Sequence, residues 1–210
     1  MRRMKPMSNV RRGRLVVVSG PSGVGKGTVL KHVLERDDFV YSVSATTRNP
    51  RDGEVDGVNY FFISRDKFED MISKDEFIEY AQYNGNYYGT PRFFVEKMLS
   101  EGKNVILEIE VKGAMQVKKV MPEAIFVFIA PESREILEAR LRGRGTETDD
   151  VISGRLKIAE NEIRACLLYD YIVINRDGAI KECADDIVCA VKSDSMKPSN
   201  MYNCVSDFFN

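Results

Sequence analysis

This chain lacks long apolar runs and an excess of charge of one sign. After its basic start, the only apolar run near the N-terminus covers residues 15–18, far shorter than the core of a signal peptide, and no stretch could span a bilayer as a helix. The formal net charge is −1, so there is no overall positive field to hold a nucleic-acid backbone. We therefore expect no membrane and no nucleic-acid partner, and any anion must be bound locally.

Cysteine and histidine are also rare. The four cysteines lie in the last quarter of the chain, without a C-x-x-C pair or the density of a disulfide scaffold. Reduced thiols and a cytoplasmic location fit this pattern best. The only histidine, His32, falls on an expected helix, and we interpret it as structural or solvated.

The apolar residues that are present form a regular pattern. Runs rich in β-branched and aromatic residues occur at 15–18, 105–109, 124–129 and 171–174, and segments of helical period separate most of them. This βαβ pattern predicts an α/β fold with a parallel sheet. Between Tyr41 and Gly89, short alternating segments such as residues 58–63, turn glycines and many tyrosines indicate an antiparallel insert, with Ser64 as N-cap of a short helix.

A glycine-rich loop follows the first expected strand and leads into a helical segment. The loop and the helix start consist of Gly20, Pro21, Ser22, Gly23, Val24, Gly25, Lys26, Gly27 and Thr28. In such a loop, backbone N–H groups and the helix N-terminus bind a triphosphate, and Lys26 supplies a mobile charge for the β and γ phosphates. The usual pattern has Ser or Thr directly after the lysine. Because Gly27 stands there, Thr28 is the candidate magnesium ligand, with binding through water as the alternative.

Two further segments carry a resemblance to a known family. They are Ser-Val-Ser-Ala-Thr-Thr-Arg-Asn-Pro-Arg-Asp-Gly-Glu at 42–54, and the stretch from Phe-Ile-Glu-Tyr-Ala-Gln-Tyr to Gly-Asn-Tyr-Tyr-Gly-Thr at 77–90. With the loop, over roughly residues 13–190, the sequence resembles guanylate kinases. The resemblance implies transfer of the γ-phosphoryl group of ATP to GMP or dGMP, in line and with Mg²⁺, giving ADP and GDP for purine nucleotide metabolism.

The resemblance also implies a division of the chain. A P-loop kinase core, a parallel sheet flanked by helices, is expected at 13–42, 91–133 and 157–192. A mixed α+β GMP-binding insert is expected at 43–90, and a helical lid at 134–156. Residues 1–12 are expected to be a disordered tail and 193–210 a C-terminal tail. Monomer and homodimer both stay open.

Guanine presents donors at N1 and N2 and an acceptor at O6, so its selection requires a carboxylate on one edge and donors on the other. Glu79 can be this carboxylate, and Glu76 is the alternative. By similarity to the family, Ser44 and Thr90 would serve O6 or the nearby phosphate. The GMP phosphate would be held by Arg48, Arg51, Tyr60 and Tyr88, although ordinary strand packing also explains the tyrosines.

A second acidic group follows the expected strand at 105–109. Glu110 stands where the family has aspartate, and Lys112 where it has glutamine. The resemblance implies a role in base contact or magnesium-water positioning for these positions. An acidic residue at the C-terminal end of a parallel strand still lies where α/β sheets bind ligands.

The resemblance assigns charge neutralisation to three lid arginines, Arg140, Arg144 and Arg155. Arg134 and Arg142 do not match and are expected to be solvated. Asn175, after the last expected strand, would hydrogen-bond adenine, although an asparagine there is often only a turn residue. No general base is required, because the acceptor phosphate has a second pKa of about 6 and is largely ionised at neutral pH.

Two rival functions share parts of this pattern. A guanylate-kinase-like interaction module would keep the fold without catalysis, but the intact loop lysine and lid arginines argue against it. A kinase for another nucleoside monophosphate shares the Gly-Lys-Gly-Thr ending of the loop, and only the insert discriminates against it.

Overall fold

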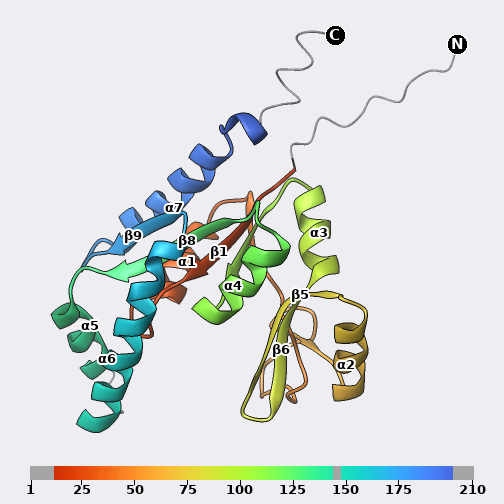
Figure 1. Ribbon diagram of the computed structural model, residues 1–210, viewed down its shortest axis with the longest axis horizontal. Helices are drawn as coiled ribbons and strands as arrows, with labels where there is room; N and C mark the ends of the chain where they lie inside the picture. The colour runs from red at the N-terminus through yellow and green to blue at the C-terminus, as the bar shows by residue number, and fades with distance from the viewer. Residues whose placement is uncertain (1–11, 144–147, 201–210) are drawn as a thin grey trace, which may run out of the picture.

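The computed structural model of the protein describes residues 12–143 and 148–200. Its centre is a five-stranded parallel sheet in the order β2-β7-β1-β8-β9 (Figure 1). The strands are β1 (Leu15–Ser19), β2 (Phe39–Tyr41), β7 (Asn104–Glu108), β8 (Ile125–Pro131) and β9 (Tyr171–Asn175). The four apolar runs predicted as strands are thereby confirmed.

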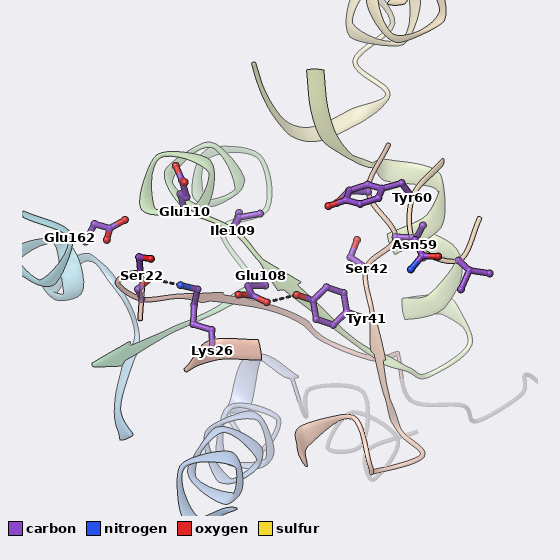
Figure 2. Close-up of a pocket in the computed structure, with 14 residues that line it drawn as sticks. Ser22, Lys26, Tyr41, Ser42, Asn59, Tyr60, Glu108, Ile109, Glu110 and Glu162 are labelled. Atoms are coloured by element: carbon purple, nitrogen blue, oxygen red, sulfur yellow. Dashed lines mark hydrogen bonds between the residues drawn. The ribbon is translucent and has the colours of Figure 1, made fainter. Parts of the chain in front are cut away.

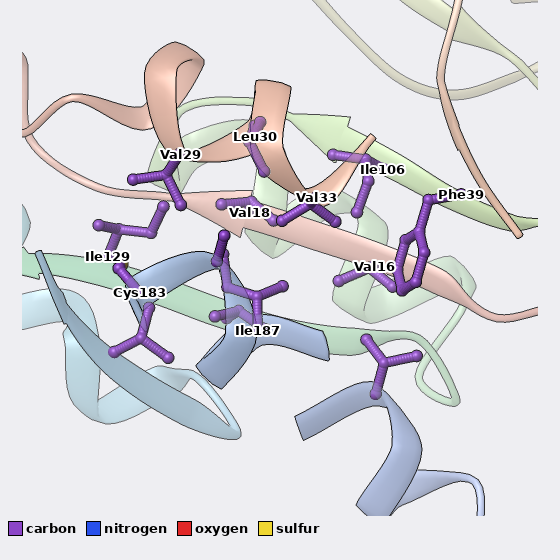
Figure 3. Packing of buried hydrophobic residues seen from close by; sticks show 14 of the residues in the cluster. Val16, Val18, Val29, Leu30, Val33, Phe39, Ile106, Ile129, Cys183 and Ile187 are labelled. Carbon is purple, nitrogen blue, oxygen red and sulfur yellow. The ribbon is translucent and has the colours of Figure 1, made fainter. Parts of the chain in front are cut away.

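Helices cover both faces of this sheet because its strands are apolar on both sides. Val16 and Val18 of β1 pack with helices α1 (Lys26–Val33) and α7 (Ile180–Asp194), as Figure 3 shows. Leu15 and Val17 point the other way, toward α3 (Arg92–Ser100) and α4 (Val111–Val120). Val18 is in register with Glu108, so the glycine-rich loop and the acidic residues after β7 meet at one sheet edge.

A second, four-stranded sheet forms the insert, in the order β4-β3-β6-β5. Its elements are β3 (Ala45–Thr46), β4 (Phe61–Phe62), β5 (Phe77–Tyr83), β6 (Asn86–Pro91) and helix α2 (Arg65–Ser73). The sheet is mixed, because β3 pairs with β4 in parallel and with β6 antiparallel. Ser64 caps α2 by accepting a hydrogen bond from the N–H of Lys67, as predicted.

The strand expected at 58–63 is shorter than predicted. Val58 and Asn59 donate their backbone N–H groups to the carbonyl of Val55, so a turn occupies the first half of the segment. Val58 is 68% exposed as a result, and only Phe61–Phe62 joins the sheet.

Two helices form the region expected as a lid, α5 (Arg134–Arg142) and α6 (Asp149–Arg164). They stand side by side at one end of the molecule in Figure 1. Five buried apolar side chains hold them together: Leu137, Leu141, Ile152, Leu156 and Ala159. A short 3-10 helix, η1 (Ala165–Leu168), then leads into β9.

Part of the expected C-terminal tail is folded. Asp194, the last residue of α7, is 4% exposed and accepts a hydrogen bond of 2.6 Å from Arg14. Asn200 bonds to the same carboxylate, so residues 193–200 pack on the body. Within the described ranges, no helix is long and apolar enough to cross a membrane.

Candidate active site

A cleft of about 500 Å³ lies between the C-terminal edge of the parallel sheet and the insert (Figure 2). The glycine-rich loop lines one side through Gly20, Ser22 and Lys26. The opposite side comes from the start of the insert, with Ser44 and Tyr60 among its residues. The cleft therefore brings the predicted triphosphate loop and part of the predicted GMP site together.

The loop has the backbone conformation that its glycines permit. Gly23 and Gly25 have φ values of 87° and 93°, in the left-handed region, and α1 begins directly afterwards at Lys26. The Lys26 ammonium donates to the carbonyl oxygens of Gly20 at 2.7 Å and Pro21 at 3.3 Å. The lysine thus lies over the concave side of its own loop, where a phosphate would be received.

Gly27 and Thr28 occupy the exposed first turn of α1. A Cβ built on Gly27 would meet no atom within 4 Å, so no close approach requires glycine at this position. The Thr28 backbone N–H donates to the carbonyl of Gly25. Both positions are accessible at the loop end of the helix, and the role of Thr28 toward magnesium stays a prediction.

Acidic and phenolic side chains line the floor of the cleft. Tyr41 donates a hydrogen bond to the carboxylate of Glu108, which ends β7. Glu110 is exposed at the N-cap of α4 and also lines the cleft, as predicted. Sequence reasoning left Tyr41 and Glu108 without a role, although their places at the ends of neighbouring strands were a usable signal. Glu162, on α6, gave no such signal.

Glu79 has the geometry of a base-reading carboxylate. It is 7% exposed, and its Oε1 accepts a hydrogen bond of 2.7 Å from the hydroxyl of buried Thr90. Burial raises the pKa of the Glu79 carboxyl, while hydrogen bonds from Thr90 oppose this effect. A Cβ on Gly113 would lie 3.2 Å from Glu79 Oε2, so this glycine lets α4 approach the carboxylate. The alternative, Glu76, is exposed.

Arg48 is aimed by a neighbouring carboxylate. Its two terminal nitrogens each donate to Glu54 at 2.9 Å, and the backbone N–H of Arg51 donates to the same carboxylate at 2.7 Å. These bonds lower the pKa of Glu54 to about 2. Arg48 also lies 5.5 Å from the ring centre of Tyr60, whose ring in turn packs edge-on against Tyr88. The structure thus gathers three of the predicted phosphate ligands, Arg48, Tyr60 and Tyr88, with the Arg51 backbone beside them.

The lid arginines reach the glycine-rich loop from the other side. Arg140 donates to the carbonyl oxygens of Val24 at 3.3 Å and Asn175 at 3.1 Å, and Arg155 contacts the Ser22 hydroxyl at 3.4 Å. Arg144 lies outside the described residues. Arg134 and Arg142 are exposed and pair with helix carboxylates, as predicted for solvated charges.

Asn175 is hydrogen-bonded to the backbone of the glycine-rich loop. The residue is 3% exposed, and its amide nitrogen donates to the carbonyl of Val24 at 2.7 Å. The amide oxygen is buried and has no hydrogen-bond partner among the described residues. Contact of Asn175 with adenine therefore stays a prediction. His32, on α1, pairs with Glu35 just after the helix and does not line the cleft, consistent with a structural role.

A glycine-rich loop between a strand and a helix at the edge of a parallel sheet is the arrangement that P-loop proteins use to bind nucleotide phosphates. An arginine and tyrosine cluster in the insert suits a second, phosphorylated ligand, so the fold and the site are those of a P-loop kinase of small phosphorylated acceptors. The family model "Guanylate kinase" matches residues 12–190. The chain belongs to the guanylate kinase family. The fold class, the family and the enzyme class expected from the sequence are confirmed.

Individual relatives agree with this assignment. The guanylate kinase of Bacillus anthracis is 58% identical over 167 residues, which cover 79% of this chain and 82% of that protein. The guanylate kinase of Clostridioides difficile (strain 630) is 50% identical over 201 residues, covering 95% and 97%. The crystal structure of guanylate kinase from Anaplasma phagocytophilum superposes with a TM-score of 0.67 at 37% identity, covering 89% and 88% of the two chains.

Proposed function

We propose that the cleft carries out the guanylate kinase reaction with its two nucleotides on opposite sides. The γ-phosphoryl group of ATP, held by the glycine-rich loop, moves in line to the phosphate of GMP or dGMP, which is held by the insert. The observation that best supports separate binding sites for ATP and GMP is the buried carboxylate of Glu79. It is hydrogen-bonded to Thr90 in the insert and is not part of the glycine-rich loop. It matches the donor edge of guanine.

ATP would bind through the backbone N–H groups of the loop and the N-terminus of α1. Lys26 would exchange its bonds to the Gly20 and Pro21 carbonyls for phosphate oxygens. Among the described residues, no cluster of His, Cys, Asp or Glu forms a metal site. Mg²⁺ requires no such cluster, because proteins commonly hold it through one or two groups and the substrate phosphates. Thr28 would supply its hydroxyl or a water contact, and the ion would neutralise phosphate charge.

GMP would bind with guanine on Glu79 and Thr90 and its phosphate on Arg48, Arg51, Tyr60 and Tyr88. A guanidinium already aimed by a carboxylate can bind a phosphate at low entropic cost. Ser44 lines the cleft between the two sheets and would contact the phosphate or O6. Glu110 lines the same cleft near α4 and would approach the base.

No side chain needs to remove a proton, because the acceptor phosphate is largely ionised at neutral pH. The residues of this chain would therefore catalyse the reaction by aligning the two nucleotides and by neutralising the charge of the transferring phosphoryl group. Lys26 and the lid arginines Arg140, Arg144 and Arg155 would offset the charge that spreads over the transferring phosphoryl oxygens. The contact of Arg155 with Ser22 brings one of these guanidinium groups to the loop. A monomer or a homodimer in the cytoplasm is part of this proposal.

The direct test is to incubate the full chain with ATP, Mg²⁺ and GMP and to quantify ADP and GDP. Equal amounts of the two products, with no ADP formed when GMP is omitted, are expected. GMP binding without any turnover would overturn the proposal and leave a binding module. ADP formation that does not depend on GMP would indicate a nucleotide hydrolase instead.

A further inference from the structure

Glu162 lines the cleft, yet the reaction described above gives it no role. One of its carboxylate oxygens, Oε2, is inaccessible to solvent and has no hydrogen-bond partner in the described part of the chain. Burial raises the pKa of this carboxyl and nearby Glu110 raises it further, whereas the charge of Lys26 and a hydrogen bond from the Ser22 backbone lower it. A partly buried carboxylate requires such compensation, and here the compensating groups both belong to the glycine-rich loop.

The place of Glu162 along α6 is equally specific. Earlier in the helix, Leu156 and Ala159 pack into the apolar cluster that joins α6 to α5. Directly after Glu162, Ile163 packs against the cluster beneath the parallel sheet, together with Tyr169. Glu162 therefore lies at the point where α6 passes from the lid to the core. A side chain at this point can hold the helix to the core while the lid part of α6 packs against α5.

Glu162 shares a helix face with one of the lid arginines. Arg155 stands seven residues earlier, about two turns of the helix, so the two side chains leave α6 on the same side. Both lie at the same loop residue: Arg155 donates to the Ser22 hydroxyl at 3.4 Å, and Glu162 lies beside Ser22, whose backbone lowers the pKa of the carboxyl. Figure 2 shows Glu162 beside Ser22, on the loop side of the cleft. The loop and the lid helix are thus joined at two points.

We propose that Glu162 is a positioning residue, which fixes α6 to the glycine-rich loop at Ser22 and so determines where Arg155 meets the transferring phosphoryl group. This inference rests on the proposed function, because it assumes that Arg155 acts in phosphoryl transfer. Glu162 touches neither nucleotide in this account. The proposed effect on the reaction passes through Arg155 and the contact at Ser22, and the charge of Lys26 serves to balance the carboxylate.

The first experiment replaces Glu162 by glutamine, which keeps the size of the side chain and removes its charge. We expect kcat to fall about tenfold, since a small displacement of a catalytic group is sufficient for such a loss. The KM for GMP should stay within about twofold, because the insert is untouched. Glu160→Gln is the matched control, since Glu160 is exposed on the same helix and pairs with Arg134 outside the cleft. It should leave kcat unchanged.

The second experiment is a double-mutant cycle with Arg155→Ala. If Glu162 acts through Arg155, Glu162→Gln should change kcat by less than about twofold in the Arg155→Ala background. A full tenfold loss in that background would show independent effects and overturn the inference. Glu162→Asp, with the charge retained on a shorter side chain, provides a second variant with the same expectation if the glutamine variant does not fold. Absence of GMP phosphorylation by the wild-type chain would instead refute the proposed function.

Discussion

The hydroxyl of Thr90 donates a hydrogen bond of 2.7 Å to Oε1 of Glu79, and both residues are buried in the insert. This bond fixes one oxygen of the carboxylate. The other oxygen faces Gly113 at the start of α4, where the absence of a side chain leaves room beside it. The pair therefore presents an oriented carboxylate at the junction of insert and core, as recognition of the N1 and N2 donors of guanine requires.

Replacement of Glu79 by glutamine should raise the KM for GMP by about 10–100-fold, because a buried acceptor for a guanine donor is replaced by an amide that cannot satisfy both donors. The KM for ATP should change little, since the glycine-rich loop belongs to the parallel-sheet core and Glu79 to the insert. Initial rates at varied GMP and ATP provide the measurement. Glu76→Gln is the control, because Glu76 is exposed. An unchanged KM for GMP in the Glu79 variant would indicate Glu76 or Glu110 as the base reader.

The stability of the chain should carry a pH signature of Glu79. Burial raises the pKa of this carboxyl in the folded state above its ordinary value of 4.5, so the native state binds the proton more tightly than the unfolded state. In the interval between these pKa values the contribution of Glu79 to stability decreases as the pH rises. The Tm of Glu79→Gln relative to the wild type should therefore be higher at pH 7 than at pH 4. A relative Tm that falls over this interval would contradict the assignment.

Gly27 can accept a side chain. Because a Cβ there meets no atom within 4 Å, Gly27→Ser should fold normally. It should gain about 0.5 kcal/mol from the higher helix propensity of serine, or a Tm increase of ~1–2 °C. The new hydroxyl directly follows Lys26, as in the usual phosphate-loop pattern, so the Mg²⁺ concentration for half-maximal activity should fall. An unchanged Mg²⁺ requirement would indicate that Thr28 or water already serves the ion.

Removal of the Lys26 ammonium should separate chemistry from acceptor binding. Lys26→Ala is expected to lower kcat at least ~100-fold, because a charge positioned on the transferring group is lost. GMP binding, measured by calorimetry, should persist, since the insert residues are unaltered. Lys31→Ala, exposed on the same helix, is the control. Simultaneous loss of turnover and GMP binding would indicate misfolding or a wrongly placed site.

The sequence predicted four of the five strands of the parallel sheet, because each of these four is a continuous apolar run that helices cover on both sides. The short strand β2 was not among the predicted runs. The alternation of apolar and polar residues predicts a strand at Val58, because this pattern contains no sign of the turn that begins at Val55. The site residues likewise divide into those that local motifs predict and those that only the packing of the chain brings to the cleft. Lys26, Glu110 and Ser44 come from local motifs and lie in the cleft as expected. Glu162 reaches the cleft only through the packing of a distant helix, which local patterns do not encode.

The choice between Glu79 and Glu76 illustrates the same limit. Both are carboxylates in one motif, and three residues separate them. Burial of Glu79 and its bond to Thr90 depend on the pairing of β5 with β6, a contact across the turn of the hairpin. Only the folded chain distinguishes them.

The most direct test of the account is the ratio of kcat/KM for GMP to that for AMP, measured with saturating ATP and Mg²⁺. AMP lacks the donor pair that Glu79 is proposed to read, so buried polar groups would remain unpaired in its complex. We predict that GMP, and dGMP with it, is preferred over AMP and UMP by at least ~100-fold. Equal efficiencies for GMP and AMP would contradict guanine recognition by the insert.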